Sequence, residues 1–450
     1  MSLAAVILAA GQGTRMKTQL PKVLHPVAGK AMVQYALDLA DALECAETAL
    51  VIGHGAEQVR ATVGARAQFA FQAEQLGTGH AVLQARDLLR GKTDAVVVTY
   101  ADMPLMQAAT LQKMIALQKS TGATIAMLTI VSDDSMAFGR IIRDANGRVQ
   151  GIVEERDCTP AQLQIRELNC GVYCFDADWL WNRLDQLQPS GKKKEYYLTD
   201  LVALAVAEQR AVEAIIVEDG REMIGVNTRV QLAQAEHIMR ERINTAHMLA
   251  GVTLIDPATT YIETGVVIGM DTVIEPNTHL RGDTRIGADC RIGPNTIIRN
   301  SQVGDGCEIL ACDLTDAVVA ERVQMGPFAR LRPGAQIGRH VKIGNFGEVK
   351  NSRIGEGSHI GHFSYIGDTE MGAHVNIGAG TITCNFDGKQ KNQTVIGDEV
   401  FIGSDTLLVA PVQIGARART GAGAVVTKNI PEDSLAVGLP ARVIRKLTGK

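Results

Sequence analysis

The sequence predicts an α/β domain with a mostly parallel sheet, then one long helix, and then a parallel β-helix. Three observations carry this prediction. Over residues 1–227, short aliphatic and β-branched runs alternate with segments of helical periodicity. Over residues 228–250, apolar residues recur every three or four positions, as on one face of a helix. Over residues 251–450, an aliphatic residue recurs at every sixth position for most of the length, which is typical of a parallel β-helix.

The first domain, residues 1–227, is expected to be Rossmann-like, with helices covering a parallel sheet. In open sheets of this kind, ligands bind at the carboxyl ends of the strands. The expected strands are residues 6–8, 49–52, 95–99, 125–131 and 214–217, and the expected helices are residues 32–43, 79–89 and 110–119.

The linker, residues 228–250, is expected to be a single amphipathic helix between the two domains. Thr228 and Gln231 have the spacing of a capping box at its start. Gly251 is a suitable stop. The apolar face consists of Leu232, Ala235, Met239, Ile243 and Ala246.

The second domain, residues 251–450, is expected to be a prism of stacked coils. Each aliphatic residue of the repeat points inward, so that stacking buries an apolar column that no single coil could bury alone. The repeat weakens over residues 310–332, and residues 383–394 resemble an inserted loop, where function is often found. The inward positions include Ile268, Ile274, Leu280, Ile286, Ile292, Ile298, Ile337, Ile343, Val349, Ile354, Ile360, Ile366, Met371, Ile377, Ile396, Ile402, Leu408, Ile414 and Val426.

Composition and charge exclude several classes of protein. The chain has 46% hydrophobic and 21% charged residues, as in ordinary globular proteins, and a net charge of −4 without a dense Lys/Arg tract. This argues against nucleic acid or a membrane as a partner and leaves small-molecule substrates. The apolar run 4–10 is too short to span a bilayer. Eight scattered cysteines show neither CxxC nor zinc-finger spacing, so we expect a cytoplasmic protein with reduced thiols.

A glycine-rich turn follows the first expected strand. Residues 9–16 read AAGQGTRM, and a turn of this kind between strand and helix lets backbone N–H groups approach a phosphate closely. The turn is neither GxGxxG nor a Walker A sequence. Arg15 and Lys22 follow, the second in a loop stiffened by Pro21, and two cations there could screen a triphosphate and a leaving pyrophosphate.

Three further polar residues of the first domain are candidates with an alternative interpretation each. Asp102 ends the expected strand 95–99, at the edge where such sheets bind ligands, but it could simply cap the turn before Pro104. Asn227 could be a helix-entry residue. Glu154 could be a solvated surface charge.

The repeat region carries polar residues that its folding does not require, namely Arg332, Lys350, His362, Tyr365 and Asn376. Since six-residue spacing stacks equivalent positions of successive coils, we expect these distant residues to form one pocket. His362 is the natural general base, because imidazole accepts a proton efficiently near neutral pH. His362 could instead be structural, and Lys350 could be an ordinary solvated lysine.

The first domain resembles the sugar-nucleotide pyrophosphorylases, through LAAGxGTRM at residues 8–16, PKxL at 21–24 and the loop 72–79. The resemblance implies Mg²⁺ held by Asp102 and Asn227, and catalytic roles for Arg15 and Lys22. Ala101 departs from the usual glycine of the family and should crowd the sugar slightly. The implied contacts to UTP and the product nucleotide sugar are Leu8, Ala9, Ala10, Gly11, Lys22, Gln72, Gly77, Thr78, Tyr100, Ala101, Asp102, Gly139, Glu154, Asn169 and Asn227.

The repeat region resembles the hexapeptide acyltransferases, which are left-handed β-helices and form trimers with active sites between subunits. Residues 376–385, NIGAGTITCN, are similar to the N-acetyltransferase half of a bifunctional family. Phe386 replaces that family's usual Tyr, and the tail around Arg442 is closer to simpler acetyltransferases. The resemblance implies His362 as catalytic base, an amino-sugar phosphate site at Arg332, Lys350, Tyr365 and Asn376, and acetyl-CoA contacts at Ala379, Asn385, Phe386, Ser404, Ala422 and Arg442.

Together the two resemblances cover about residues 3–436. They imply a homotrimeric enzyme that acetylates glucosamine 1-phosphate with acetyl-CoA and then couples the product to UTP, giving UDP-N-acetylglucosamine for bacterial peptidoglycan and lipopolysaccharide. One alternative is a single-activity sugar-1-phosphate nucleotidyltransferase whose β-helix is structural or regulatory. Another is a non-catalytic sensor that binds a nucleotide sugar.

Overall fold

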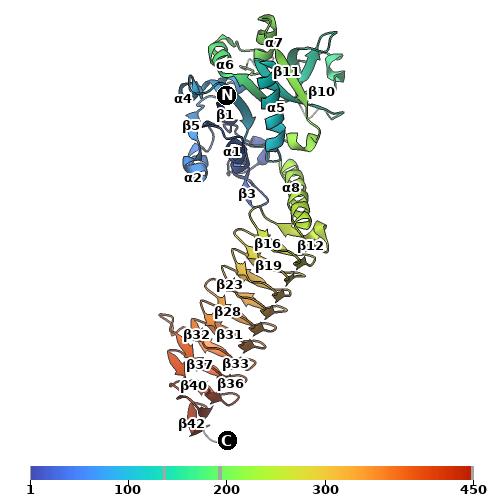
Figure 1. The fold of residues 1–450 in the computed structure, drawn as a ribbon. Coiled ribbons are helices and arrows are strands. Elements are labelled where there is room, and N and C mark those ends of the chain that lie inside the picture. Colours follow the sequence, from blue (N-terminus) through green and yellow to red (C-terminus); the bar gives the residue numbers. More distant parts are fainter. Residues whose placement is uncertain (1, 135–137, 191–194, 447–450) are drawn as a thin grey trace. The chain divides into compact units, whose positions relative to one another are not determined.

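The computed structural model describes residues 2–134, 138–190 and 195–446 (Figure 1). The chain forms two compact units, Met1–Met239 and Arg240–Lys450. The division falls within helix α8 (Arg229–Leu249), which matches the helix expected at 228–250 to within a residue at each end. Within the described residues, no helix combines the length and apolar character needed to cross a bilayer.

The first unit is built on a nine-stranded sheet whose main path runs β11-β7-β10-β6-β1-β4-β5. The neighbouring strands are parallel, except that β10 runs antiparallel to both β6 and β7. The strands are β1 (Leu3–Leu8), β4 (Glu47–Ile52), β5 (Gln68–Phe71), β6 (Ala95–Tyr100), β7 (Ile125–Val131), β10 (Glu167–Asp176) and β11 (Val212–Ile216), with the antiparallel pair β8 (Arg140–Arg143) and β9 (Val149–Val153) attached to β10.

All five expected strands are present, and the sequence analysis missed β5, β8, β9 and β10 of this sheet. It also missed a separate antiparallel pair, β2 (Pro26–Val27) and β3 (Lys30–Ala31). Strand β10 was not predicted because Gly171 breaks the hydrophobic pattern of its sequence. Gly171 has a φ of 78° and interrupts the pairing of β10 with β7 between Asn169 and Tyr173. The helix expected at 79–89 is two helices instead. The helices of this unit are α1 (Met32–Ala42), α2 (Ala56–Val63), α3 (Thr78–Leu83), α4 (Arg86–Leu89), α5 (Ala108–Thr121), α6 (Ala177–Arg183) and α7 (Asp200–Ala207).

Helix α8 contributes to the core of each unit with a different part of its length. Ala235 and Ile238 belong to an apolar cluster with Met16 of the first unit. Ile243 packs against the core of the second unit. The buried side chain of Asn244 donates to the backbone oxygens of Pro257 and Thr260, at 2.9 and 3.1 Å.

The second unit is a left-handed parallel β-helix with three sheets, which we call the first, second and third walls (Figure 1). The first wall comprises β12 (Thr253–Leu254), β15 (Val273–Ile274), β18 (Arg291–Ile292), β21 (Glu308–Ile309), β24 (Gln324–Met325), β27 (Lys342–Ile343), β30 (His359–Ile360), β33 (Asn376–Ile377), β36 (Phe401–Ile402), β39 (Arg419–Thr420), β41 (Ser434–Gly438) and β42 (Ala441–Lys446).

The second wall comprises β13 (Tyr261–Ile262), β16 (His279–Arg281), β19 (Ile297–Arg299), β22 (Asp313–Thr315), β25 (Arg330–Leu331), β28 (Glu348–Lys350), β31 (Tyr365–Gly367), β34 (Ile382–Cys384), β37 (Leu407–Val409) and β40 (Val425–Val426). The third wall comprises β14 (Val267–Ile268), β17 (Arg285–Ile286), β20 (Gln302–Val303), β23 (Val318–Val319), β26 (Gln336–Ile337), β29 (Arg353–Ile354), β32 (Thr369–Met371), β35 (Thr394–Ile396) and β38 (Val412–Ile414).

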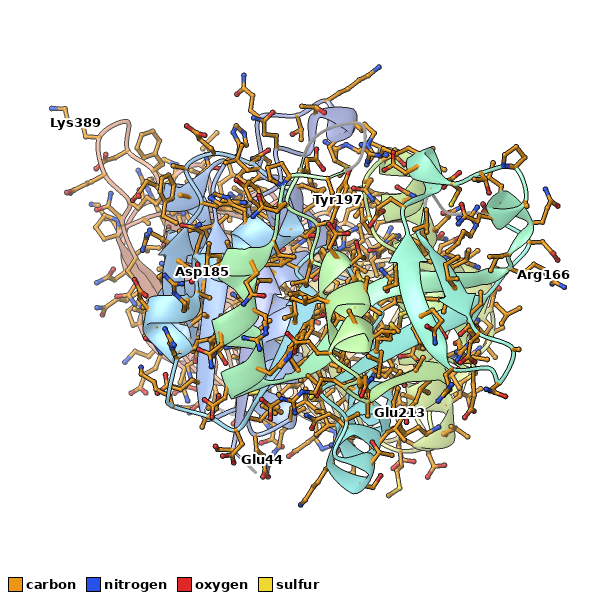
Figure 2. The ribbon with its side chains drawn as sticks, turned by 90° about the horizontal axis from the view of Figure 1, so that it is seen from above. Glu44, Arg166, Asp185, Tyr197, Glu213 and Lys389 are labelled. Atoms are coloured by element: carbon orange, nitrogen blue, oxygen red, sulfur yellow. The ribbon has the colours of Figure 1, made fainter. Side chains whose placement is uncertain are left out.

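The inward positions of the six-residue repeat form the core that was predicted. Ile343, Ile360, Ile377 and Ile402 pair in register along the first wall and are all buried. Residues 310–332 do not leave the β-helix, because β21 to β25 continue the three walls. In contrast, residues 385–393 form the expected loop between β34 and β35. Lys389 extends outward from this loop (Figure 2).

Two candidate active sites

A cavity of about 560 Å³ opens at the carboxyl ends of β1 and β6 in the first unit. Arg15 lies in its wall, as do all the contacts implied for UTP and the nucleotide sugar except Ala101. The side chain of Ala101 is buried in an apolar cluster with Ala9 and Val33. The expectation that this methyl group crowds the sugar is therefore wrong, because the side chain does not line the cavity.

The glycine-rich turn after β1 is shaped by Gly13, which has a φ of 63°. A Cβ at Gly13 would lie 2.7 Å from the Cβ of Lys22, so a larger residue would push the lysine away from the turn. This close approach places Lys22 and Arg15 in the same wall of the cavity. Two cations beside a loop of exposed backbone N–H groups suit a polyphosphate.

Asp102 and Asn227 converge on a single cation. The Nζ of Lys22 contacts Oδ2 of Asp102 and donates to Oδ1 of Asn227 at 3.0 Å. The side chains of Lys22 and Asp102 are only 11% and 16% exposed. Two oxygens directed at one positive centre fit Mg²⁺, which typically takes one or two protein oxygens and completes its shell with phosphate and water. Within the described part of the chain, no cluster of three or more His, Cys, Asp or Glu side chains could hold a metal ion.

The segment that carries Asn227 is tied to both sides of this site. The backbone N–H of Val226 donates to the oxygen of Asp102 at 2.8 Å. The backbone N–H of Gln231 donates to the Thr228 hydroxyl oxygen at 3.2 Å, and Oε1 of Gln231 accepts from the N–H of Asn227 at 2.9 Å, so the expected capping box also holds Asn227 in place. Asn227 thus both enters the helix and lines the cavity.

Arg229 connects three segments that carry charged or polar groups of the site. Its Nε donates to the oxygen of Met16, next to Arg15, at 3.3 Å. Its Nη1 lies 3.3 Å from Nδ1 of His25, which follows Lys22 by three residues. His25 is buried, and burial together with Arg229 lowers its pKa. Arg229 itself does not line the cavity. It holds together the segments that carry the lining residues Arg15, Lys22 and Asn227.

Gln72 and Gly77 form another part of the cavity wall. The buried Nε2 of Gln72 lies 3.3 Å from the Gly77 oxygen and 3.0 Å from Nδ1 of His80. Gly77 has a φ of 115°, and a Cβ there would lie 2.6 Å from the Tyr196 oxygen. Gln75, which the sequence analysis missed, donates to the oxygen of Ala10 at 2.7 Å and so joins this loop to the phosphate-binding turn.

Glu154 faces the cavity rather than the solvent. Burial raises its pKa, although its carboxylate accepts a bond from the hydroxyl of Thr199 at 3.1 Å. The surface-charge interpretation is therefore wrong. Asn169 donates to the Tyr173 hydroxyl at 2.8 Å and accepts from the N–H of Gly171 at 3.1 Å. Tyr197, which the sequence analysis left out of the site, also lines the cavity; Figure 2 labels it.

Basic residues gather on the second wall of the β-helix. Lys350 ends β28, and Arg332 follows β25, where it donates to Glu348 at 2.9 Å. Lys391, which the sequence analysis missed, reaches this place from the loop 385–393: its contact with Lys350 and its charge lower the pKa of Lys350. The spacing could not reveal Lys391, because the loop interrupts the repeat.

Tyr365 lies flat on the same wall. A Cβ at Gly367 would be 2.4 Å from the Tyr365 hydroxyl oxygen and 2.6 Å from Cζ, which shows that the ring extends across the glycine. In the register of the wall, Lys350 and Gly367 are neighbours. The phenol is thus directed toward the column that carries the basic groups.

His362 lies at the corner between the first and second walls, and its Nδ1 contacts Oδ1 of Asn345 on the preceding coil. Asn376, in contrast, belongs to the first wall, where it pairs with His359 and Phe401. The prediction that one chain brings these residues into a single pocket is wrong for Asn376. It projects from a different wall than Lys350 because the prism turns a corner between β33 and β34.

The implied acetyl-CoA contacts Ala379, Ser404 and Ala422 occupy one column, one coil apart, on the corner that carries His362. The column is held by backbone bonds from Gly380 to His362, Asp405 to Ala379 and Gly423 to Ser404, at 3.2, 2.6 and 2.8 Å. The other three contacts lie elsewhere. Asn385 binds Asp368 at the start of the inserted loop, Phe386 is 61% exposed, and Arg442 is in β42.

Fold and sites together define a two-part transferase, with a nucleotidyltransferase domain followed by a hexapeptide-repeat β-helix. A MobA-like NTP transferase domain matches residues 5–164, and the bacterial transferase hexapeptide repeat matches residues 265–300 and 393–428. A crystal structure of UDP-glucose pyrophosphorylase complexed with UDP-glucose aligns with 54% of this chain and 100% of its own length, at a TM-score of 0.43 and 20% identity.

Relatives called bifunctional protein GlmU match nearly the whole chain. That of Pelobacter propionicus is 46% identical over 99% of this chain and 97% of its own length. The one from Trichlorobacter lovleyi is 47% identical, over 98% and 96%. The one from Heliobacterium modesticaldum is 48% identical, over 96% and 94%. The chain belongs to this bifunctional GlmU family. It is an enzyme with UDP-N-acetylglucosamine pyrophosphorylase and glucosamine-1-phosphate N-acetyltransferase activities, which sets aside the single-activity and sensor alternatives.

Proposed function

We propose that the cavity of the first unit transfers the uridylyl group of UTP to N-acetylglucosamine 1-phosphate, and that the second unit supplies this substrate by acetylating glucosamine 1-phosphate with acetyl-CoA. The observation that carries the first half is the convergence of Asp102 and Asn227 on the ammonium of Lys22. The product is a precursor of the bacterial cell wall. A cytoplasmic location agrees with the use of UTP and acetyl-CoA.

In the first reaction an oxygen of the sugar phosphate attacks the α-phosphorus of UTP, and pyrophosphate leaves. Arg15 and Lys22 offset the charge that moves onto the leaving group, and the glycine-rich turn holds the phosphates by its N–H groups. Asp102 and Asn227 would hold Mg²⁺, which as a Lewis acid lowers the charge on the phosphates. Lys22 would then turn from these two oxygens toward phosphate.

The base and sugar are bound at the two remaining sides of the cavity. Gln72 and the Gly77–Thr78 segment face the uracil end, while Glu154 and Asn169 face the sugar. The partly buried carboxylate of Glu154 is suited to accept hydrogen bonds from sugar hydroxyls, since burial raises its pKa and its bond to Thr199 uses only one oxygen. We include Gln75, Tyr197 and Thr199 among the residues that shape the site.

In the second reaction the amine of the sugar loses a proton as it attacks the thioester, and CoA leaves as the thiol. His362 is the proposed base. With Oδ1 of Asn345 as its partner, Nδ1 carries the hydrogen and Nε2 is the basic nitrogen. Arg332, Lys350 and Lys391 offer three positive charges to the sugar phosphate. A bound dianion would relieve the repulsion that lowers the pKa of Lys350.

We also propose that the enzyme acts as a homotrimer with acetylation sites between copies. The support is that Asn376 and Lys350 project from different walls of one chain. A small substrate that needs both must therefore receive them from two copies. The acyl donor would lie along the column of Ala379, Ser404 and Ala422, since the small side chains there leave room for it.

Two single substitutions on one chain test the division of labour, because each activity is the control for the other. In His362→Gln we expect acetylation to fall by about 10² to 10⁴ with uridylyl transfer unchanged. In Asp102→Asn we expect uridylyl transfer to fall about 100-fold, with acetylation unchanged. CoA release and pyrophosphate release measure the two activities. The assignment would be contradicted if His362→Gln lost uridylyl transfer, if Asp102→Asn lost acetylation, or if either variant kept both activities.

A further inference from the structure

His80 holds the side chain of Gln72, which lies at the uracil end of the first cavity. The Nε2 of Gln72 is 3.0 Å from Nδ1 of His80 and 3.3 Å from the backbone oxygen of Gly77. Gln72 and Gly77 are among the described residues that line the cavity, whereas His80 is not. The imidazole can therefore influence a bound nucleotide only through the amide of Gln72.

The contact with Gly77 determines which end of the Gln72 amide points in which direction. A carbonyl oxygen can only accept hydrogen bonds, so the amide atom that faces the Gly77 oxygen must be the nitrogen. The same nitrogen faces Nδ1 of His80, and these two contacts use both of its hydrogens. No described residue donates a hydrogen bond to Oε1 of Gln72. The amide thus offers a ligand an acceptor and no donor.

The bond from Gln72 also determines the tautomer of His80. An imidazole nitrogen that accepts carries no hydrogen, so the ring is neutral and its hydrogen is on Nε2. That nitrogen lies 3.2 Å from the amide nitrogen of Gln84, and two amides cannot both donate to one neutral ring. Gln72 is buried and has a second partner in Gly77, whereas Gln84 is half-buried. Gln84 is therefore the amide that turns, and it accepts from Nε2.

The backbone that carries His80 is packed tightly against a neighbouring segment. In helix α3 the N–H of Gly79 donates to the Tyr196 oxygen at 2.8 Å, and a Cβ at Gly79 would lie 3.0 Å from that oxygen. The rings of His80 and Tyr196 are neighbours, with centroids 6.3 Å apart. His80 therefore cannot move away when its partner changes orientation.

Reversal of the Gln72 amide is unfavourable as long as His80 has this tautomer. Oε1 would then face the Gly77 oxygen and Nδ1 of His80, and all three are acceptors. Two hydrogen bonds would be lost, and a buried acceptor without a donor carries the full cost of its desolvation. The histidine and the glycine oxygen together keep the acceptor of Gln72 available to the cavity.

An acceptor held in this way distinguishes the two pyrimidines by what they carry at N3. Uracil has an N–H group at N3, which can donate to Oε1 of Gln72. Cytosine has a lone pair at N3, which Oε1 would repel, and a site with a fixed hydrogen-bonding group rejects a ligand that leaves the group unpaired. A freely turning amide would instead serve both bases, because its nitrogen can donate to N3 of cytosine or to an oxygen of uracil.

We infer that His80 is a positioning residue that makes the first site select UTP over CTP, by fixing the orientation of the Gln72 amide. This inference rests on the proposed function, from which it takes the nucleotide and the place of its base. His80 makes no contact with the nucleotide itself. Its contribution is to remove the freedom of Gln72 to adapt to the wrong base.

The test restores that freedom while the site keeps its shape. His80→Asn places an amide near the position of Nδ1, and this amide can present either its oxygen or its nitrogen to Gln72. We expect kcat/KM for UTP to stay within about threefold of the wild type while kcat/KM for CTP rises, so that their ratio falls about tenfold or more. CTP is also measured as a competitive inhibitor against UTP, which gives the ratio of affinities even where CTP is not turned over.

Two more variants act on the same ring. His80→Phe keeps a ring beside Tyr196 but has no acceptor, so the ratio should fall here as well, with a moderate loss for UTP. Gln84→Ala removes the other partner of the imidazole and is the matched control. Its ratio should stay within about twofold of the wild type, because Nε2 then donates to water. Circular dichroism and thermal unfolding check the fold of each variant.

An unchanged ratio in both His80 variants would overturn the inference. So would equal losses for UTP and CTP, since these would mean that the ring only fills space. Gln72→Ala separates the inference from the proposed function, because it should lose both discrimination and part of the UTP activity. Wild-type behaviour of Gln72→Ala would contradict the proposed place of uracil. Lost discrimination in Gln72→Ala, with full discrimination in both His80 variants, would overturn only the role of His80.

Discussion

Gly367→Ala should impair acetylation by displacing a side chain that is two residues away. The φ of Gly367 lies outside the left-handed region, so the backbone accepts alanine. The new Cβ would lie 2.4 Å from the Tyr365 hydroxyl oxygen, 2.6 Å from Cζ and 2.7 Å from Cε1. Real Cβ contacts are not shorter than 3.0 Å, so the ring must move by at least about 0.6 Å, and outward is the free direction.

The magnitude follows from the bond that Tyr365 is proposed to make with the sugar phosphate. A hydrogen bond to a charged group contributes about 1.5–3 kcal/mol, which corresponds to about a 10- to 150-fold loss in kcat/KM for glucosamine 1-phosphate. Uridylyl transfer on the same chain should not change. The unfolding midpoint of the β-helix should change little, since the displaced ring lies on the outer surface of the wall.

A double-mutant cycle with Tyr365→Phe decides whether the glycine acts through the hydroxyl. Steady-state CoA release is measured for the wild type, both single variants and the double variant. If the reasoning is correct, the double variant is no worse than the poorer single variant, because the same bond is lost in both. A Gly367→Ala enzyme with wild-type kcat/KM, or losses that simply add in the cycle, would refute it.

Three further predictions concern the first unit and the core. Arg229→Met should lower uridylyl transfer about tenfold and raise the Mg²⁺ concentration needed for half-maximal activity, since the segments bearing Arg15, Lys22 and Asn227 lose their common partner; an unchanged Mg²⁺ requirement would contradict a positioning role. Burial raises the pKa of Glu154 above its ordinary 4.5, so the folded state binds the proton more tightly than the unfolded state, and the carboxyl destabilises the fold as pH rises through that value. Glu154→Gln should therefore match the wild type in urea unfolding at pH 3.5 and be more stable at pH 7, and equal stability at both would count against the burial argument. Ile360→Ala, at a fully buried position of the prism, should cost about 3 kcal/mol in the unfolding free energy of the β-helix; a loss under about 1 kcal/mol would mean that the coils collapse around the gap.

Much of the first site could be predicted because its residues lie in contiguous motifs. The turn at residues 9–16, the loop 72–79 and Asp102 each carry their own signal, and all three line one cavity. Gln75 lies inside the loop and was overlooked only because no chemistry was attached to it. Arg229 could not be found, since its role depends on contacts with Met16 and His25, more than two hundred residues away in the sequence.

The second site was harder to predict because a repeat gives the position of a residue along the prism more readily than the wall it occupies. Inward residues follow from the six-residue period, but the outward direction of Asn376 depends on how many residues each corner takes. Lys391 comes from a loop outside the period, so its contact with Lys350 had no signal in the spacing.

Residue order and spacing were sufficient to predict the two architectures, the phosphate-binding turn and the inward column of the β-helix. These depend on local periodicity and short motifs, which fix side-chain direction through backbone geometry alone. The folded chain was needed to show that β10 runs antiparallel within the sheet, that Ala101 faces the core, and that Asn376 and Lys350 stand on different walls. Those features depend on which distant segments pack together, because long-range packing and corner lengths, not local pattern, set the direction in which each side chain finally points.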